Sequence, residues 1–376
     1  METVVFTFIG IFFIKLIYEK ISLEKARKKI KIVIHVNGIR GKSTVSRLID
    51  AGLRDGKKRV FTKVTGTEPK YIDIDNQEKN IKRIGKANIR EQIKTIKKAA
   101  KCQADILVLE CMAVKPELQK ISEEKIVKAD IGVITNVRYD HLDEMGESLE
   151  KITNSLCNMM PKNGVLVTGE EKNLGIIKEK AELKVTKVLF MDELKDEYKE
   201  IDFIENVAVA LKVCECLGVD REVALKRMKK YKKDSGVLKE IKFLNSQGKK
   251  ISFINLLAAN DPDSSEKIIK NFESEELWTR KKYLMVNNRR DRLSRLEQFV
   301  NFVEKHEKKF EKIFISGESI NIFYKKLNKN INKVEVLKNM EQFDILTEDS
   351  VIFAVGNICG KGKELLKEIE SRGIDE

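Results

Sequence analysis

The chain has 376 residues, of which 42% are hydrophobic and 35% are charged, and it carries a formal net charge of +14. This composition excludes an intrinsically disordered chain, and the length indicates two domains, each able to bury a core. The charge favours a polyanionic partner or an anionic membrane surface, so nucleic acid, an acidic polymer and a multi-anionic substrate are all compatible with it.

The first residues form a strongly apolar run. Residues 4–18, VVFTFIGIFFIKLIY, contain a single charge, at Lys15. A spanning helix needs about 20 apolar residues, with a range of roughly 17–25, so the run is short, although Lys15 can snorkel to the interface. The basic segment that follows indicates a cytoplasmic location for the rest of the chain. We expect an anchor helix over residues 1–22 in the cell membrane, with the catalytic domains on the cytoplasmic side; a buried first helix of a soluble domain is the alternative.

Apolar runs then alternate with helical patterns. Runs typical of buried strands occur at residues 31–36, 59–65, 104–110, 129–137, 163–169 and 187–191. This alternation predicts an α/β fold, with a parallel sheet covered by helices on both faces, over residues 23–236. The alternation begins again from about residue 236 and continues to the end, which predicts a smaller C-terminal α/β domain of Rossmann type over residues 237–376. Ligands of such sheets bind at the carboxyl ends of the strands.

The first strand leads into HVNGIRGKST, residues 35–44. A Gly-rich turn between a strand and a helix is the usual setting of a phosphate-binding loop. Its candidate nucleotide-binding residues are Gly38, Gly41, Lys42, Ser43 and Thr44. Lys42 would reach the β and γ phosphates and Ser43 would bind Mg²⁺. The usual loop has another glycine five residues before the Gly-Lys pair, where this chain has Val36, and Arg40 inside the loop either touches phosphate or points to solvent.

Carboxylates follow the next two core strands. Glu110 ends the run ILVLE and is a candidate magnesium ligand, because Mg²⁺ prefers hard oxygen donors; a surface glutamate is the alternative. TNVRYDHLDEMG, residues 135–146, places His141 beside Asp140 at the end of another strand, which favours a catalytic metal role for His141. The sequence therefore predicts Lys42, Glu110 and His141 as catalytic residues, with Mg²⁺ held by Ser43, Glu110 and His141.

Together these motifs resemble the Mur ligase superfamily, whose members join amino acids through amide bonds with ATP. The shared features are a phosphate loop shortened to G-x-x-G-K-[ST]-[ST], a glutamate ending a core strand, and T-N-x-x-x-D-H-x-D. Such ligases lack the early glycine, which accounts for Val36. Residues 203–219 resemble the family helix whose asparagine contacts the nucleotide, here Asn206, with a helix cap as the alternative. The carbamylated lysine of many members is Leu156 here, and Lys151 is out of register, so that role is not carried over.

Seven short sequence segments, in this order along the chain, make the resemblance more specific within the superfamily. They are HVNGIRGKST, VTGTEPKYI, LECMAV, VRYDHLDEMG, NLLAANDPDS, NNRRDR and VGNICGKG. Together they resemble the ATP-binding ligase subunits of poly-γ-glutamate synthase, the CapB/PgsB family, over nearly the whole chain. The resemblance implies ATP and Mg²⁺ as cofactors and polymerisation of glutamate through its γ-carboxylate by way of an acyl phosphate. It also implies a membrane-associated complex with small hydrophobic subunits; we expect a homo-oligomer and no nucleic-acid partner.

Polar loops follow the strands of the C-terminal domain. By analogy with the family, Asp261 lies against the ribose or in the domain hinge, although Asn260, Asp261 and Asp263 are also typical of a turn.

NNRRDR supplies further candidate residues for binding the substrate. Arg289 and Arg292, with Asn288, are expected to bind substrate carboxylates, because guanidinium groups bind carboxylates bidentately; a solvated basic loop is the alternative. Gly360, in the glycine-rich turn before the last helix, is suited to holding a carboxylate on backbone N–H groups.

Two other functions are alternatives to the polymerisation of glutamate. One is a Mur-type ligase acting on cell-wall or folate precursors, and the other is a membrane-tethered P-loop ATPase acting on nucleic acid.

Overall fold

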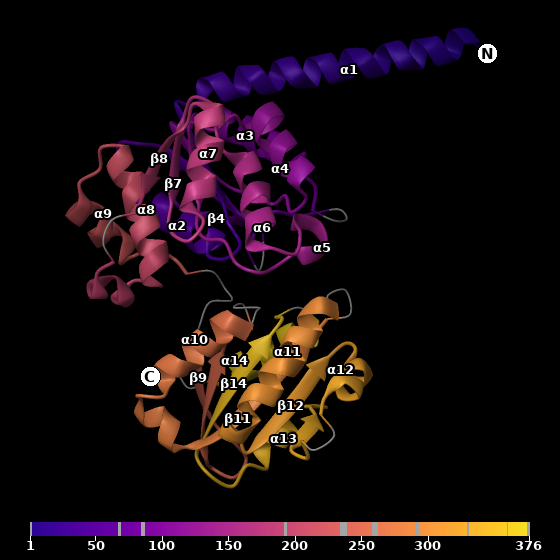
Figure 1. Cartoon of the computed structure of the whole chain (residues 1–376), viewed down its shortest axis with the longest axis vertical. Coiled ribbons are helices and arrows are strands. Elements are labelled where there is room, and N and C mark those ends of the chain that lie inside the picture. The colour runs from indigo at the N-terminus through magenta and orange to yellow at the C-terminus, as the bar shows by residue number, and fades with distance from the viewer. Residues whose placement is uncertain are drawn as a thin grey trace. The chain divides into compact units, whose positions relative to one another are not determined.

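The structure is a computed structural model that describes residues 2–66, 69–83, 87–191, 194–233, 239–257, 262–289, 293–328, 331–358 and 360–373. The chain divides into two compact units, Met1–Asp234 and Ser235–Glu376 (Figure 1). Both units are α/β, as the sequence predicts.

Among the described residues, the first unit contains an eight-stranded sheet in the order β4-β3-β2-β5-β1-β6-β7-β8. Its strands are β1 (Ile32–Asn37), β2 (Val60–Val64), β3 (Lys70–Ile72), β4 (Glu78–Asn80), β5 (Ile106–Glu110), β6 (Ile131–Ile134), β7 (Val165–Thr168) and β8 (Lys187–Phe190). The six predicted strands are confirmed and pair in parallel, because helices connect them. The edge strands β3 and β4 are antiparallel and were not predicted.

Helices cover both faces of this sheet. They are α1 (Glu2–Lys29), α2 (Lys42–Leu53), α3 (Glu91–Lys101), α4 (Pro116–Ile121), the π-helix η1 (Ser122–Val127), α5 (Leu142–Met145), α6 (Leu149–Leu156), η2 (Cys157–Met159), α7 (Leu174–Lys184), η3 (Asp196–Glu200), α8 (Ile204–Cys216) and α9 (Arg221–Met228). Along β5, Ile106 and Val108 pack against α2, α8 and α9, whereas Leu107 and Leu109 pack against α3, η1 and the end of α1. Side chains of a strand alternate between faces, so a continuous apolar run fills two cores at once.

The apolar N-terminal run lies in α1, which continues past the predicted boundary at residue 22. Residues 3–18 are exposed, and Figure 1 shows this indigo part of the helix extending away from the sheet. Near the end of α1, Leu23 and Ala26 are buried against the first unit, and Arg27 donates to Asp130 Oδ2 at 2.7 Å. No helix within the described ranges is both long and apolar enough to span a bilayer, so the structure does not support the predicted transmembrane helix.

In the described part of the second unit, six strands form a sheet in the order β13-β12-β11-β14-β10-β9, parallel except for β9. The strands are β9 (Lys239–Leu244), β10 (Lys250–Asn255), β11 (Lys281–Asn288), β12 (Lys312–Gly317), β13 (Val334–Val336) and β14 (Ser350–Gly356). The helices are α10 (Pro262–Phe272), η4 (Glu276–Thr279), α11 (Leu293–His306), η5 (Glu307–Lys309), α12 (Ile320–Lys326), α13 (Glu341–Asp344) and α14 (Lys361–Arg372). Because β14 returns between β10 and β11, their carboxyl ends form a topological switch point, where ligands of such sheets bind.

Candidate active site

The phosphate loop joins β1 to α2 and requires glycine at two positions. Gly38 has φ 130° and Gly41 has φ 78°. A Cβ atom on Gly38 would lie 2.0 Å from Thr135 Oγ1, and one on Gly41 would lie 2.3 Å from Asn206 Oδ1. Val36 lies within β1, paired with Glu110, so the strand occupies the position at which a longer loop would place its first glycine.

The helix that follows the loop presents its N-terminus to it. No side chain caps α2 at Gly41, and Ser43 and Thr44 lie in its first turn. The first N–H groups of a helix lack partners within the helix and carry its positive partial charge. This end of α2 is therefore suited to bind phosphate oxygens through its backbone.

Lys42 is held across its own loop. Its Nζ donates to Gly38 O at 2.7 Å and to Ile39 O at 3.2 Å. Burial lowers the pKa of Lys42, although the carboxylates of Glu110 and Asp140 act in the opposite direction. Gly38 O and Ile39 O are neutral carbonyl oxygens, so an anionic ligand would stabilise the partly buried ammonium further, which fits a role against phosphate.

Ser43 and Glu110 form the candidate magnesium site. Ser43 Oγ donates to Glu110 Oε2 at 2.9 Å, and the Thr65 backbone N–H donates to the same oxygen at 2.5 Å. Glu110 is only 3% exposed, so the alternative of a surface glutamate is wrong. Two hard oxygen donors beside a phosphate loop fit Mg²⁺, which takes its other ligands from phosphate and water.

The loop after β6 is hydrogen-bonded to the phosphate loop. Thr135 Oγ1 donates to Arg40 O at 2.6 Å, and Asn136 Oδ1 accepts from Arg40 N at 3.1 Å. The guanidinium of Arg40 donates to Asp140 Oδ2 at 3.0 Å. The backbone and the side chain of Arg40 are therefore both hydrogen-bonded to the segment after β6. The sequence alone left the role of this residue open.

His141 lies at the same edge of the sheet, with a left-handed backbone of φ 52°. Its N–H donates to Asp140 Oδ1 at 2.9 Å, and its ring Nε2 lies 3.7 Å from Asp140 Oδ2. No group of three or more His, Cys, Asp or Glu side chains suited to a metal occurs within the ranges that the structure describes. The role of His141 as a metal ligand stays a prediction, whereas Ser43 and Glu110 are in direct contact.

Asn206 lies beside the phosphate loop. The helix α8 begins at Ile204, and its N-cap is Phe203, so the alternative of an Asn206 cap is wrong. The Asn206 side chain borders Gly41, and its amide donates to Asp202 Oδ1 at 3.5 Å. This position is consistent with the nucleotide contact that the resemblance implies.

The candidate substrate residues lie in the second unit, at the carboxyl ends of β11 and β14. Asn288 and Arg289 line a pocket there with Arg295 and Asn357. Asn288 is 5% exposed, and its Nδ2 has no hydrogen-bond partner among the described residues. A buried amide hydrogen that lines a pocket suits an acceptor such as a carboxylate oxygen.

Gly356, at the end of β14, lines this pocket, whereas Gly360 is not among the described residues that line it. Gly360 is the N-cap of α14, with φ 63°. Asn287, which the sequence did not single out, accepts from Ser316 Oγ at 2.8 Å and donates to Asn357 O, so it joins the ends of β11 and β12 to the segment after β14. Arg292 and Asp261 lie outside the described residues.

Two family profiles match consecutive parts of the chain. The Mur ligase middle domain matches residues 36–225, and the poly-gamma-glutamate synthase CapB C-terminal domain matches residues 241–372. The first match spans the phosphate loop, Glu110 and Asn206, and the second spans the pocket of Asn288.

Two relatives match nearly the whole chain. The chain is 34% identical to the capsule biosynthesis protein CapB of Bacillus anthracis, over 95% of this chain and 80% of that protein. It is also 34% identical to the PGA synthase CapB of Bacillus subtilis strain 168, over 96% of this chain and 95% of that protein.

Solved structures share the fold. E. coli FolC in complex with ADP superposes with a TM-score of 0.70 at 13% identity, covering 94% of each chain. At that identity the likeness shows the fold alone. From its sequence relatives and from both matching domains, the chain belongs to the poly-gamma-glutamate synthase CapB family.

Proposed function

We propose that this chain polymerises glutamate into poly-γ-glutamate by activating a γ-carboxylate with ATP. Membership of the family makes the chain an ATP-dependent amide ligase. The observation that carries the proposal is the contact of Ser43 with Glu110 beside the phosphate loop, in a chain whose second unit matches the CapB C-terminal domain. That match also favours the polymer over cell-wall and folate substrates.

The first chemical step transfers a phosphoryl group. A γ-carboxylate oxygen attacks the γ-phosphorus of ATP, the bond to the β–γ bridging oxygen breaks, and ADP leaves an acyl phosphate behind. The amides of the loop and Lys42 would bind the phosphates, which carry most of the charge in such reactions. Mg²⁺ bound through Ser43 and Glu110 would neutralise the phosphate oxygens.

The second step forms the amide bond. The neutral amine of the next glutamate attacks the acyl carbon, and inorganic phosphate leaves with the oxygen that came from the carboxylate. We place the carboxylates of this glutamate at the pocket of Asn288 and Arg289, with Arg292 and Gly360 as further candidates, because amide N–H and guanidinium donors fix anionic groups. The net charge of +14 would favour binding of the anionic polymer.

We further propose that α1 attaches the enzyme to a membrane complex on its cytoplasmic side. The support is a run of exposed apolar side chains on α1, which includes Phe6, Phe8 and Phe12. Contiguous exposed apolar surface of this kind marks an interaction site. Small hydrophobic subunits are the expected partners, and the homo-oligomer stays a prediction.

The proposal is tested by incubating the chain in membranes with ATP, Mg²⁺ and labelled L- or D-glutamate, then sizing any protease-resistant polymer. We expect ADP formation that depends on glutamate, labelled polymer of increasing length, and loss of both with Lys42→Ala. ATP hydrolysis that DNA stimulates and glutamate does not would contradict the proposal.

A further inference from the structure

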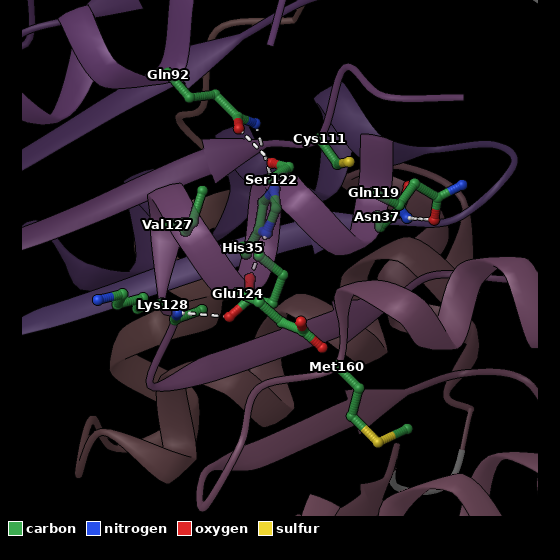
Figure 2. A network of polar contacts seen from close by, with 12 residues as sticks. His35, Asn37, Gln92, Cys111, Gln119, Ser122, Glu124, Val127, Lys128 and Met160 are labelled. Atoms are coloured by element: carbon green, nitrogen blue, oxygen red, sulfur yellow. Dashed lines mark hydrogen bonds and ion pairs between the residues drawn. The ribbon is translucent and has the colours of Figure 1, made fainter. Parts of the chain in front are cut away.

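Gln119 belongs to a buried polar layer on one face of the first sheet, where it contacts Asn37 of β1. Figure 2 shows this layer, with Gln119 beside Asn37 and the group of His35, Gln92 and Ser122 next to them. Gln119 is 0% exposed, although it belongs to the six-residue helix α4. A glutamine without any contact with water must find its hydrogen bonds inside the protein.

The Gln119 amide makes three hydrogen bonds. Its Oε1 accepts from Asn37 Nδ2 at 2.9 Å, and its Nε2 donates to Val114 O at 2.8 Å and to Ser155 Oγ at 3.1 Å. A backbone carbonyl can only accept, so Val114 fixes the orientation of the amide. Both amide hydrogens and the carbonyl oxygen are therefore used.

These three bonds join the segments that build the ATP and metal site. Asn37 directly precedes Gly38, the first glycine of the phosphate loop. Val114 lies in the segment that follows Glu110. Ser155 lies in α6, whose Ile152 packs in one core with Ile39 of the phosphate loop.

We propose that Gln119 is a positioning residue that holds Ser43 and Glu110 at the spacing that Mg²⁺ requires. Ser43 lies in the segment after β1, whereas Glu110 ends β5. The last residue pair between these two strands is Val36 with Glu110, and one further hydrogen bond joins Cys111 N to Val36 O. Past this point the side chain of Gln119 links the two segments. The proposal rests on the ATP and metal site of the proposed function.

Gln92 provides a matched control. It is also 0% exposed and lies in the same layer, but its partners are Ser122, which donates to its Oε1, and His35 Nε2, 3.4 Å from its Nε2. Ser122 lies in η1, and His35 lies inside β1, where it is paired with Leu109 of β5, so neither partner lies beyond the last residue pair of β1 and β5. Substitution of Gln92 removes buried hydrogen bonds without releasing the segments beyond that pair.

The experiment measures the Mg²⁺ dependence of ATP binding by calorimetry, without glutamate, for the full chain and for Gln119→Met and Gln92→Met. Methionine keeps the length of the side chain and removes its hydrogen bonds. We expect Gln119→Met to raise the Mg²⁺ concentration at half-saturation by at most about tenfold, the lower end of the effect of losing a group that contacts a metal ligand, because Gln119 acts through Asn37 and Val114. Gln92→Met should lower the melting temperature comparably and leave that concentration unchanged.

An unchanged Mg²⁺ requirement in Gln119→Met, or an equal shift in Gln92→Met, overturns the proposal. If Gln119→Met does not fold, Ser155→Ala is tested instead, because it removes one of the three hydrogen bonds of Gln119. It should raise the Mg²⁺ concentration at half-saturation about threefold. An unchanged Mg²⁺ concentration in Ser155→Ala overturns the proposal. Since binding is measured without glutamate, a chain that binds Mg²⁺ and ATP but makes no polymer contradicts the proposed function alone.

Discussion

Replacement of Gly41 by alanine tests whether the phosphate loop and Asn206 form one nucleotide site. Gly41 has φ 78°, a left-handed conformation. Alanine in that conformation costs about 1–2 kcal/mol. Its Cβ would also lie 2.3 Å from Asn206 Oδ1, so the asparagine side chain must move.

The two effects are separable. The backbone strain lowers the free energy of unfolding, whereas displacement of Asn206 would remove the hydrogen bond to the nucleotide that we expect of it. A single hydrogen bond contributes about 0.5–1.5 kcal/mol net, which corresponds to roughly 2- to 12-fold in affinity. We therefore expect Gly41→Ala to lose about 1–2 kcal/mol of stability and to bind ATP several-fold more weakly.

Gly56 is the matched control, because it has φ 77° and a Cβ there would meet nothing within 4 Å. Gly56→Ala should lose the same stability in urea unfolding and bind ATP normally in calorimetry. In an Asn206→Ala background, Gly41→Ala should weaken binding little further, because the displaced contact is already absent. Normal ATP affinity in Gly41→Ala would refute the reasoning.

Three further predictions follow from other parts of the molecule. Glu110→Gln removes the charge from the carboxylate that Ser43 and Thr65 contact, and should raise the Mg²⁺ requirement of ATP binding about tenfold; an unchanged requirement would place the metal elsewhere. Asn288→Leu removes a buried amide whose Nδ2 has no hydrogen-bond partner in the described ranges, so it should retain stability but raise KM for glutamate and not for ATP. Glu266 contacts Lys305 and Lys270, which hold its pKa at about 2, below the usual 4.5, despite partial burial. The folded state therefore gains stability above pH 4.5 and loses it as the pH falls towards 2, so Glu266→Gln should cost about 1 kcal/mol or less near neutral pH and nothing at the acid end.

Much of the fold could be predicted because buried parallel strands are continuous apolar runs. Such runs identified β1, β5 and β6, and the residues that end or follow them identified the loop, Glu110 and His141. The edge hairpin was missed because β3 is three residues long and β4 is polar, EKN, so neither strand has an apolar run.

The buried amides could not be predicted for a different reason. Gln119 lies in no motif, and Asn287 opens NNRRDR without being singled out there. The importance of both residues arises from partners distant in the sequence, such as Asn37 and Ser316. Arg40 likewise acquires its partner Asp140 only when the segments after β1 and β6 meet at one edge of the sheet. The apolar N-terminal run correctly indicated a helix, but no helix among the described residues is both long and apolar enough to span a membrane.

The most direct test of the central claim follows an oxygen atom. Glutamate labelled with ¹⁸O in its γ-carboxylate is incubated with the enzyme, ATP and Mg²⁺, and the released phosphate is analysed by mass spectrometry. If an acyl phosphate forms at the γ-carboxylate, each amide bond places one ¹⁸O atom in inorganic phosphate, and label in the α-carboxylate places none there. Polymer formation with unlabelled phosphate, or with AMP as the nucleotide product, would contradict the account.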